Sequence, residues 1–217
     1  MSLKTYTHSP QSGQKPQSMV ILLHGLGANG MDLIGLARYW EQVLPDTVFV
    51  SPDAPFPCDM APVGYQWFSL QEWTPESILR GVEQAAPVLN DYIDKMLEHY
   101  DLSDDRLALV GFSQGTMMSL YAGPRRKNKI AGVLGYSGAL VGAESMGGPD
   151  IHKIPVHLIH GDADMVVPVG AYHMARQTLE SHGFPVSGSV TRGLAHGIDD
   201  DGIEAGAGFL SRILDQK

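Results

Sequence analysis

The stretch Gly111-Phe112-Ser113-Gln114-Gly115 decides the fold expected for this chain of 217 residues. It follows an apolar, β-prone run over 106–110 and precedes a helix-like run over 116–122. A serine between two glycines at this spacing is typical of a sharp strand-to-helix turn, because the turn leaves no room for side chains two positions before and after the serine. The pattern predicts a hydroxyl that projects above a sheet at a helix N-terminus, where backbone N–H groups favour a developing negative charge.

The composition is that of an ordinary globular chain. Hydrophobic residues make up 43% and charged residues 18%, and the length suits one domain spanning residues 1–217. The net charge of −9 argues against nucleic acid as a partner. The basic run Arg125-Arg126-Lys127 is expected to be a solvated loop.

The sequence predicts a cytoplasmic protein without integral membrane association. No uncharged apolar run approaches the roughly 18 residues needed to span a bilayer, and residues 1–18 lack the apolar core of a signal peptide. Cys58 is the single cysteine, so no internal disulfide can form and a reducing compartment fits best. The oligomeric state is left open.

Strand-like and helix-like segments alternate along the chain. The expected strands are 5–8, 19–23, 47–51, 106–110, 130–136, 154–160 and 186–192, and the expected helices are 32–44, 75–97, 116–122, 169–181 and 202–214. Pro87 is expected to kink or split the second helix. This order predicts an α/β fold, with an open, mostly parallel sheet, helices on both faces, and functional loops at the carboxyl ends of the strands.

The long loop 52–73 is rich in proline and aromatic residues. Loops of this length inside a compact domain are usually functional, so we expect it to form a wall of the substrate pocket. Trp67 and Phe68 are its expected substrate-binding residues. The alternative is a loop that only covers the core, because aromatic residues bury well in many places.

A serine nucleophile needs a base to accept its proton and a third group to orient that base. Among the nine histidines, His24, His160 and His196 follow strands on the serine's side of the predicted sheet. His196 lies in the small, flexible loop 193–197 after the last strand and is the expected base.

The orienting acid is expected just past the strand that ends at His160. Asp164 is favoured over Asp162, which lies closer to the strand end and is expected to accept hydrogen bonds from amides of its own turn. The acidic run 199–201 is expected to be a solvated turn that caps the last helix. The chain order Ser113, Asp164, His196 is the order found in α/β-hydrolases.

The negative charge that develops during acyl transfer needs hydrogen-bond donors. One donor is expected to be the backbone N–H of Gln114, directly after the serine, and the other an N–H of the glycine-rich loop 24–27. Leu26 is the best candidate in that loop, and His24 is expected to brace the loop.

Two other interpretations of these residues stay open. His160, Asp162, Asp164 and His196 could offer ligands to a metal ion, but no known ligand spacing occurs and the serine turn would be unexplained, so we expect neither a metal nor another cofactor. The chain could also be a non-catalytic binding module that kept the fold, although such a protein would be expected to lose one of the three catalytic side chains.

These motifs together resemble the phospholipase/carboxylesterase family of α/β-hydrolases, which includes acyl-protein thioesterases and small bacterial carboxylesterases. The resemblance spans nearly the whole chain. It rests on His24-Gly25-Leu26-Gly27, Gln66-Trp67-Phe68, Gly111-Phe112-Ser113-Gln114-Gly115, His160-Gly161-Asp162-Ala163-Asp164 with Val166-Val167-Pro168, and Ala195-His196.

The resemblance implies that Ser113 is the nucleophile, Asp164 the acid and His196 the base, with Leu26 and Gln114 as oxyanion donors. The implied substrate is a small acyl ester or thioester, with lysophospholipids and S-acylated proteins as alternatives.

The chain departs from the family in two ways. It has Thr116 where a second glycine is common, and it has no segment that looks like a large lid, which predicts an open cleft. The dienelactone hydrolases are similar in fold but match less well, because they use a cysteine in place of Ser113.

Overall fold

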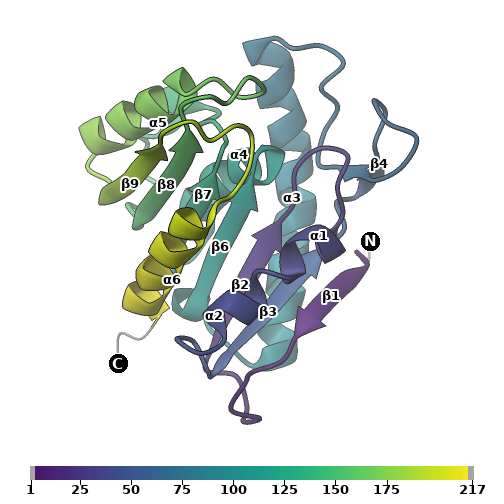
Figure 1. The fold of residues 1–217 in the computed structure, drawn as a ribbon, viewed down its shortest axis with the longest axis vertical. Coiled ribbons are helices and arrows are strands. Elements are labelled where there is room, and N and C mark those ends of the chain that lie inside the picture. The colour runs from purple at the N-terminus through teal and green to yellow at the C-terminus, as the bar shows by residue number, and fades with distance from the viewer. Residues whose placement is uncertain (1–2, 215–217) are drawn as a thin grey trace.

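The structure is a computed structural model that describes residues 3–214. A seven-stranded sheet runs through the centre of the molecule (Figure 1). In spatial order its strands are β1 (Thr5–His8), β3 (Thr47–Pro52), β2 (Ser18–Leu23), β6 (Leu107–Phe112), β7 (Gly132–Tyr136), β8 (Val156–Gly161) and β9 (Val186–Thr191). Only β1 runs antiparallel to its neighbour, and every other neighbouring pair is parallel. The predicted mostly parallel sheet is confirmed.

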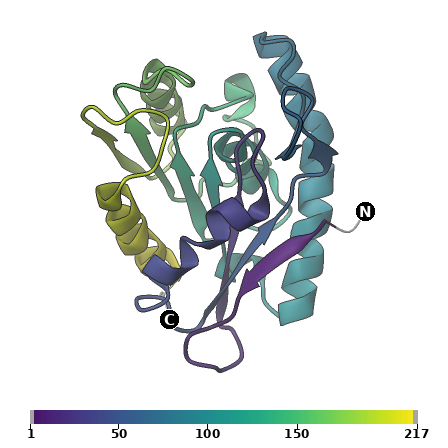
Figure 2. The ribbon, with the colours of Figure 1, turned by 45° about the vertical axis from the view of Figure 1, so that its right-hand side comes forward.

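Helices cover both faces of this sheet, as predicted (Figure 2). The helices are α1 (Gly30–Ile34), α2 (Ala37–Trp40), α3 (Pro75–Tyr100), α4 (Gln114–Ala122), α5 (Gly170–Ser181) and α6 (Asp200–Leu214). Met19, Ile21 and Leu23 of β2 belong to the buried cluster under α3, α4 and α5. Val20 and Leu22 alternate with them and belong to the cluster under α1, α2 and α6.

A small two-stranded sheet, β4 (Phe56–Pro57) with β5 (Tyr65–Gln66), lies within the long loop 52–73. An isolated antiparallel bridge between Ala28 and Tyr65 ties it to the loop after β2. The long loop is therefore anchored beside the carboxyl end of the central strands.

The single helix predicted over 32–44 was wrong, and so was a split of the next helix at Pro87. The segment 32–44 forms two short helices rather than one, because the chain tightens between them, where the Leu36 N–H donates to the Leu33 carbonyl three residues earlier at 3.0 Å. Pro87 does not split α3, which runs unbroken from Pro75 to Tyr100. The long buried face of α3 outweighs the roughly 3 kcal/mol that an internal proline costs a helix.

The basic run 125–127 is not the solvated loop that the sequence predicted. Arg126 is only 7% exposed, and its guanidinium lies 2.7 Å from a carboxylate oxygen of Asp104 and 2.6 Å from one of Asp94. The Arg125 guanidinium lies 4.0 Å from the centre of the Tyr121 ring. The run thus fastens the end of α4 to α3 and to the turn before β6.

Among the described residues, no helix combines the length and the apolar character needed to cross a lipid bilayer.

We expect Arg126→Met to lower the free energy of unfolding by about 3 kcal/mol, because it leaves the half-buried carboxylate of Asp104 without its cationic partner. Urea denaturation followed by circular dichroism measures this change. Lys127→Met, at the exposed neighbouring position, is the matched control and should change the stability little. Equal effects of the two substitutions would contradict the structural role of Arg126.

Candidate active site

Ser113 lies at the junction of β6 and α4 in a strained backbone conformation, with φ at 54° and ψ at −116°. Its N–H donates to the Tyr136 carbonyl at 2.9 Å, which ties the junction to β7. A Cβ atom on Gly111 would lie 2.4 Å from the backbone of Gly115, and one on Gly115 would lie 1.8 Å from the Leu23 carbonyl oxygen. Both glycines are therefore required for the turn that presents the serine.

Two backbone N–H groups beside Ser113 are available to a ligand. Over residues 3–214 neither the Leu26 N–H nor the Gln114 N–H donates to another protein group, whereas the neighbouring Gly27 N–H donates to the Tyr65 carbonyl at 2.9 Å. A Cβ atom on Gly25 would lie 3.2 Å from the Ser113 Cβ, so the loop 24–28 runs directly alongside the serine. The two N–H groups therefore stay the predicted donors to an oxyanion bound to Ser113.

His24 braces this loop, as the sequence predicted. Its Nε2 atom accepts a hydrogen bond from the Ala54 N–H at 2.9 Å, and its Nδ1 atom lies 2.7 Å from the Gly25 carbonyl oxygen, to which it donates. Burial lowers the pKa of His24, so the ring stays neutral at physiological pH. Both nitrogens are used within the protein.

The side chain of Gln114 fastens the long loop to the serine turn, a role that the sequence analysis missed. Its Oε1 atom accepts from the Trp67 N–H at 2.9 Å, and its Nε2 atom donates to the Phe68 carbonyl at 2.8 Å. The Trp67 indole N–H in turn donates to the His24 carbonyl at 3.1 Å. An amide is the one side chain of this length that both accepts and donates in this way.

Trp67 and Phe68 are buried, at 0% and 4% exposure, and both border a pocket of about 300 Å³ between the long loop and α3. The Trp67 ring has no exposed surface and braces the loop behind the serine. Contact of Trp67 and Phe68 with substrate stays a prediction. The exposed aromatic side chains of the long loop are Phe56 and Trp73.

Asp164 and His196 form a hydrogen-bonded pair. The Asp164 Oδ2 atom lies 2.7 Å from His196 Nδ1, while its Oδ1 atom accepts from the N–H groups of Val166 and Val167 at 2.9 Å and 2.8 Å. Burial opposes ionisation of the carboxyl, but the hydrogen bonds from His196, Val167 and Val166 outweigh it and keep the pKa of Asp164 below its usual range. The carboxylate is thus fixed in position and charged at neutral pH.

The sequence predicted that Asp162 accepts hydrogen bonds from amides of its own turn, but it bonds to a different loop. Its Oδ1 atom accepts from the Gly193 N–H at 2.6 Å, so it links the loop after β8 to the loop after β9, which carries His196. Asp199, farther along the second loop, accepts from the Gly202 N–H at 2.9 Å and caps α6, as predicted.

The imidazole of His196 packs against the residue before the serine. The ring centres of His196 and Phe112 are 4.8 Å apart, and the Ser137 hydroxyl donates to the Gly197 carbonyl at 3.4 Å. In the described part of the chain no hydrogen bond joins the Ser113 hydroxyl to His196. Catalytic hydrogen bonds of this kind often tighten only when substrate binds.

The sequence profile of the family described as Phospholipase/Carboxylesterase matches residues 7–214. The chain belongs to the phospholipase/carboxylesterase family. Among curated relatives, it is 27% identical to the esterase YpfH of Escherichia coli (strain K12), with 88% of this chain and 81% of the relative covered. It is 29% identical to acyl-protein thioesterase 1 of Saccharomyces cerevisiae, with 93% and 95% covered.

Among solved structures, the chain is similar to the crystal structure of esterase PE8. The two share 38% sequence identity with a TM-score of 0.93, and the match covers 99% of this chain and 100% of that one. The resemblance and the α/β-hydrolase fold drawn from the sequence motifs are therefore confirmed.

Thr116, which departs from the glycine common in the phospholipase/carboxylesterase family, is accommodated by glycines on β7 and just after it. A Cβ atom on Gly135 would lie 2.6 Å from Thr116 Cγ2, and one on Gly138 would lie 2.4 Å from Thr116 Cβ. The threonine hydroxyl donates to the Tyr136 carbonyl at 2.8 Å. The departure therefore adds a tie between α4 and β7 and leaves the serine turn in place.

We expect Asp164→Asn to lower kcat for p-nitrophenyl butyrate by about 10⁴-fold, because an amide no longer holds the imidazole in the tautomer that accepts the serine proton. Asp162→Asn is the matched control, since its carbonyl can still accept from the Gly193 N–H, and it should retain most activity. Steady-state kinetics measures both. A larger loss in the Asp162 variant would reverse the assignment of the acid.

Proposed function

We propose that this chain hydrolyses carboxylic esters through an acyl-enzyme on Ser113, with His196 as the base and Asp164 as the orienting acid. The class of reaction, carboxylic ester hydrolysis, follows from membership of the phospholipase/carboxylesterase family. The observation that carries the residue assignment is the strained turn that presents Ser113 at the N-terminus of α4, beside the Asp164–His196 pair.

Acylation begins when His196 Nε2 removes the proton from the Ser113 hydroxyl as Oγ attacks the ester carbonyl carbon. The carbonyl oxygen becomes an oxyanion, which accepts hydrogen bonds from the N–H groups of Leu26 and Gln114. Each such donor typically contributes about 3–4 kcal/mol to stabilisation of the transition state. The intermediate collapses as the carbon–oxygen bond to the alcohol breaks and the imidazolium donates its proton to the departing oxygen.

Deacylation repeats these steps with water. His196 removes a proton from water, which attacks the acyl carbon, and the same two N–H groups stabilise the second oxyanion. The bond from the acyl carbon to Ser113 Oγ then breaks, Oγ recovers its proton from the imidazolium, and the carboxylic acid leaves. Asp164 stays ionised throughout and stabilises the imidazolium.

Thioesters are a second substrate class for the same steps, since the departing atom becomes sulfur. What favours them is the similarity to proteins named acyl-protein thioesterase 1, including that of Saccharomyces cerevisiae. A cytoplasmic location is part of the proposal and rests on the single cysteine, which suits a reducing compartment.

We expect Ser113→Ala to abolish cleavage of p-nitrophenyl butyrate and labelling by a fluorophosphonate probe, with an unchanged melting temperature, because the variant lacks the attacking oxygen. Ser189→Ala removes an exposed hydroxyl on β9 and serves as the control, which should be labelled as fast as the parent protein. Turnover or labelling that survives in the Ser113 variant would refute the proposal. An ester and a thioester with the same acyl group, compared in the parent protein, decide between the two leaving groups.

A further inference from the structure

A small cavity of about 220 Å³ opens beside the candidate active site. We call it the histidine-side cavity. Gly25 and Ala28 of the loop after β2, Leu33 of α1, Phe112 of β6 and Ile198 of the loop after β9 line it. These wall residues are apolar, and the nitrogens of His24, which also borders the cavity, are already used within the protein.

The residues that line the histidine-side cavity adjoin both Ser113 and His196. Gly25 lies alongside Ser113, Phe112 packs against the His196 ring at 4.8 Å, and Ile198 follows His196 by two residues. The cavity is therefore bounded by the loop that carries Leu26, one of the two proposed oxyanion donors, and by the loop that carries the proposed base.

We propose that the histidine-side cavity binds the leaving group of the substrate, an uncharged apolar alcohol or thiol. The inference rests on the proposed function. The proton that His196 takes from Ser113 must pass to the departing oxygen or sulfur, so that atom must lie on the imidazole side of the tetrahedral carbon. The group attached to it then extends toward Phe112 and Ile198, while the acyl chain leaves the same carbon in another direction.

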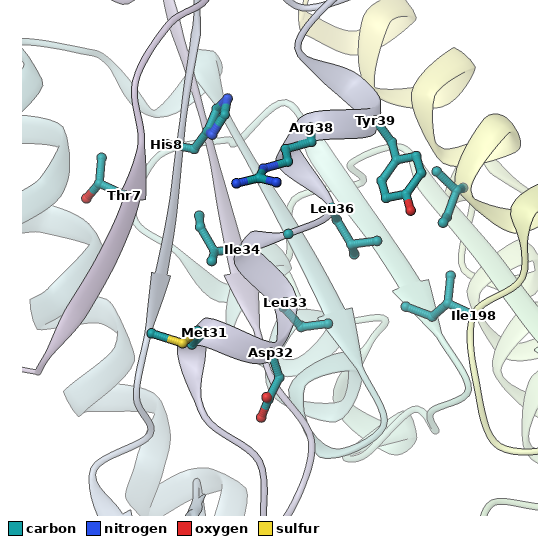
Figure 3. Close-up of a pocket in the computed structure, with 12 residues that line it drawn as sticks. Thr7, His8, Met31, Asp32, Leu33, Ile34, Leu36, Arg38, Tyr39 and Ile198 are labelled. Atoms are coloured by element: carbon teal, nitrogen blue, oxygen red, sulfur yellow. The ribbon is translucent and has the colours of Figure 1, made fainter.

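The mouth of the cavity indicates where a longer leaving group would go. Asp32, Leu33 and Ile198 line both the histidine-side cavity and a larger groove of about 800 Å³ along α1 and α2. Figure 3 shows this groove, with the Leu33 side chain extending from α1 toward Ile198. The exposed carboxylate of Asp32 at this junction disfavours a leaving group with a negative charge.

The volume sets the size of the group that fits. A water molecule in the liquid occupies about 30 Å³, so the cavity holds roughly seven heavy atoms. Each methylene that moves from water into an apolar cavity of this kind raises the binding constant by about fourfold. We expect kcat/KM to rise with the length of the alcohol until the cavity is full.

Two series of esters separate the two ends of the substrate. In the first, butanoate is joined to methyl, ethyl, butyl and hexyl alcohols, and in the second, methanol is joined to acids from acetate to octanoate. The measured quantity is kcat/KM, because it includes every step up to departure of the alcohol, whereas deacylation no longer involves the alcohol.

Ile198→Trp fills the cavity and should lower kcat/KM for hexyl butanoate at least about tenfold relative to methyl butanoate, with the acyl series unchanged. Ile198→Ala enlarges the cavity and should shift the preference toward longer alcohols. Met31→Trp is the matched control, because the exposed Met31 lines the larger groove but not the cavity, and it should keep the ratio of kcat/KM for hexyl and methyl butanoate that the parent protein shows.

The proposal is overturned if the Ile198 variants change the acyl preference instead, or if neither variant changes the alcohol preference. If Ile198→Trp does not fold, as judged by circular dichroism, the Ile198→Ala series alone decides in the same way. Turnover of methyl butanoate by the parent protein, and its loss in Ser113→Ala, report separately on the proposed function. The leaving-group proposal can therefore fail while the proposed function stands.

Discussion

The geometry of the candidate active site depends on the close contact between the start of α4 and the end of β2. Gly115 lies so near the Leu23 carbonyl that no side chain fits, and Ser113 adopts a positive φ as a result of the sharp turn. Such a backbone costs on the order of 1–3 kcal/mol and persists only where its surroundings hold it. Here the hydrogen bond from Ser113 to β7 and the packing of α4 against the sheet provide that support.

The same contact determines where the other groups must be. Since α4 begins beside the end of β2, the loop that follows β2 runs past Ser113, and the Leu26 N–H of that loop, like the Gln114 N–H, has no acceptor among residues 3–214. The long loop is then fastened to this pair by the Gln114 side chain and by the indole of Trp67. A single helix start thus positions the candidate nucleophile, both candidate donors and the loop behind them.

The candidate base, His196, is positioned from the other half of the sheet. The loops after β8 and β9 are joined by Asp162 and Gly193 and by Asp164 and His196, so they form one unit above the strand ends. The amides of Val166 and Val167 fix the remaining oxygen of Asp164, which leaves the carboxylate little freedom to turn. The imidazole of His196 is therefore oriented by the protein itself, which the proposed mechanism requires of the base.

The local features of the site could be predicted from the sequence, because they depend on short spacings. The glycines around Ser113 and the position of His196 after a strand end are of this kind. Features that depend on what packs against a segment could not be predicted. Trp67 is aromatic in either role, and only the fold shows that its ring is buried. From the sequence, Arg126 is expected to be a solvated cation, because only the fold brings Asp94 of α3 next to it. Pro87 is expected to interrupt its helix, because the sequence does not show how much of α3 is buried.

The central claim is that three side chains distant in sequence converge on one acyl group attached to Ser113. A crystal structure of the protein after reaction with a small alkyl fluorophosphonate tests it most directly. We expect phosphorus bonded to Ser113 Oγ, its oxygen about 2.7–3.1 Å from the N–H groups of Leu26 and Gln114, and His196 Nε2 within hydrogen-bond distance of Oγ or of the remaining alkoxy oxygen. Phosphorus on another residue, or an imidazole that stays out of reach of the adduct, would contradict the account.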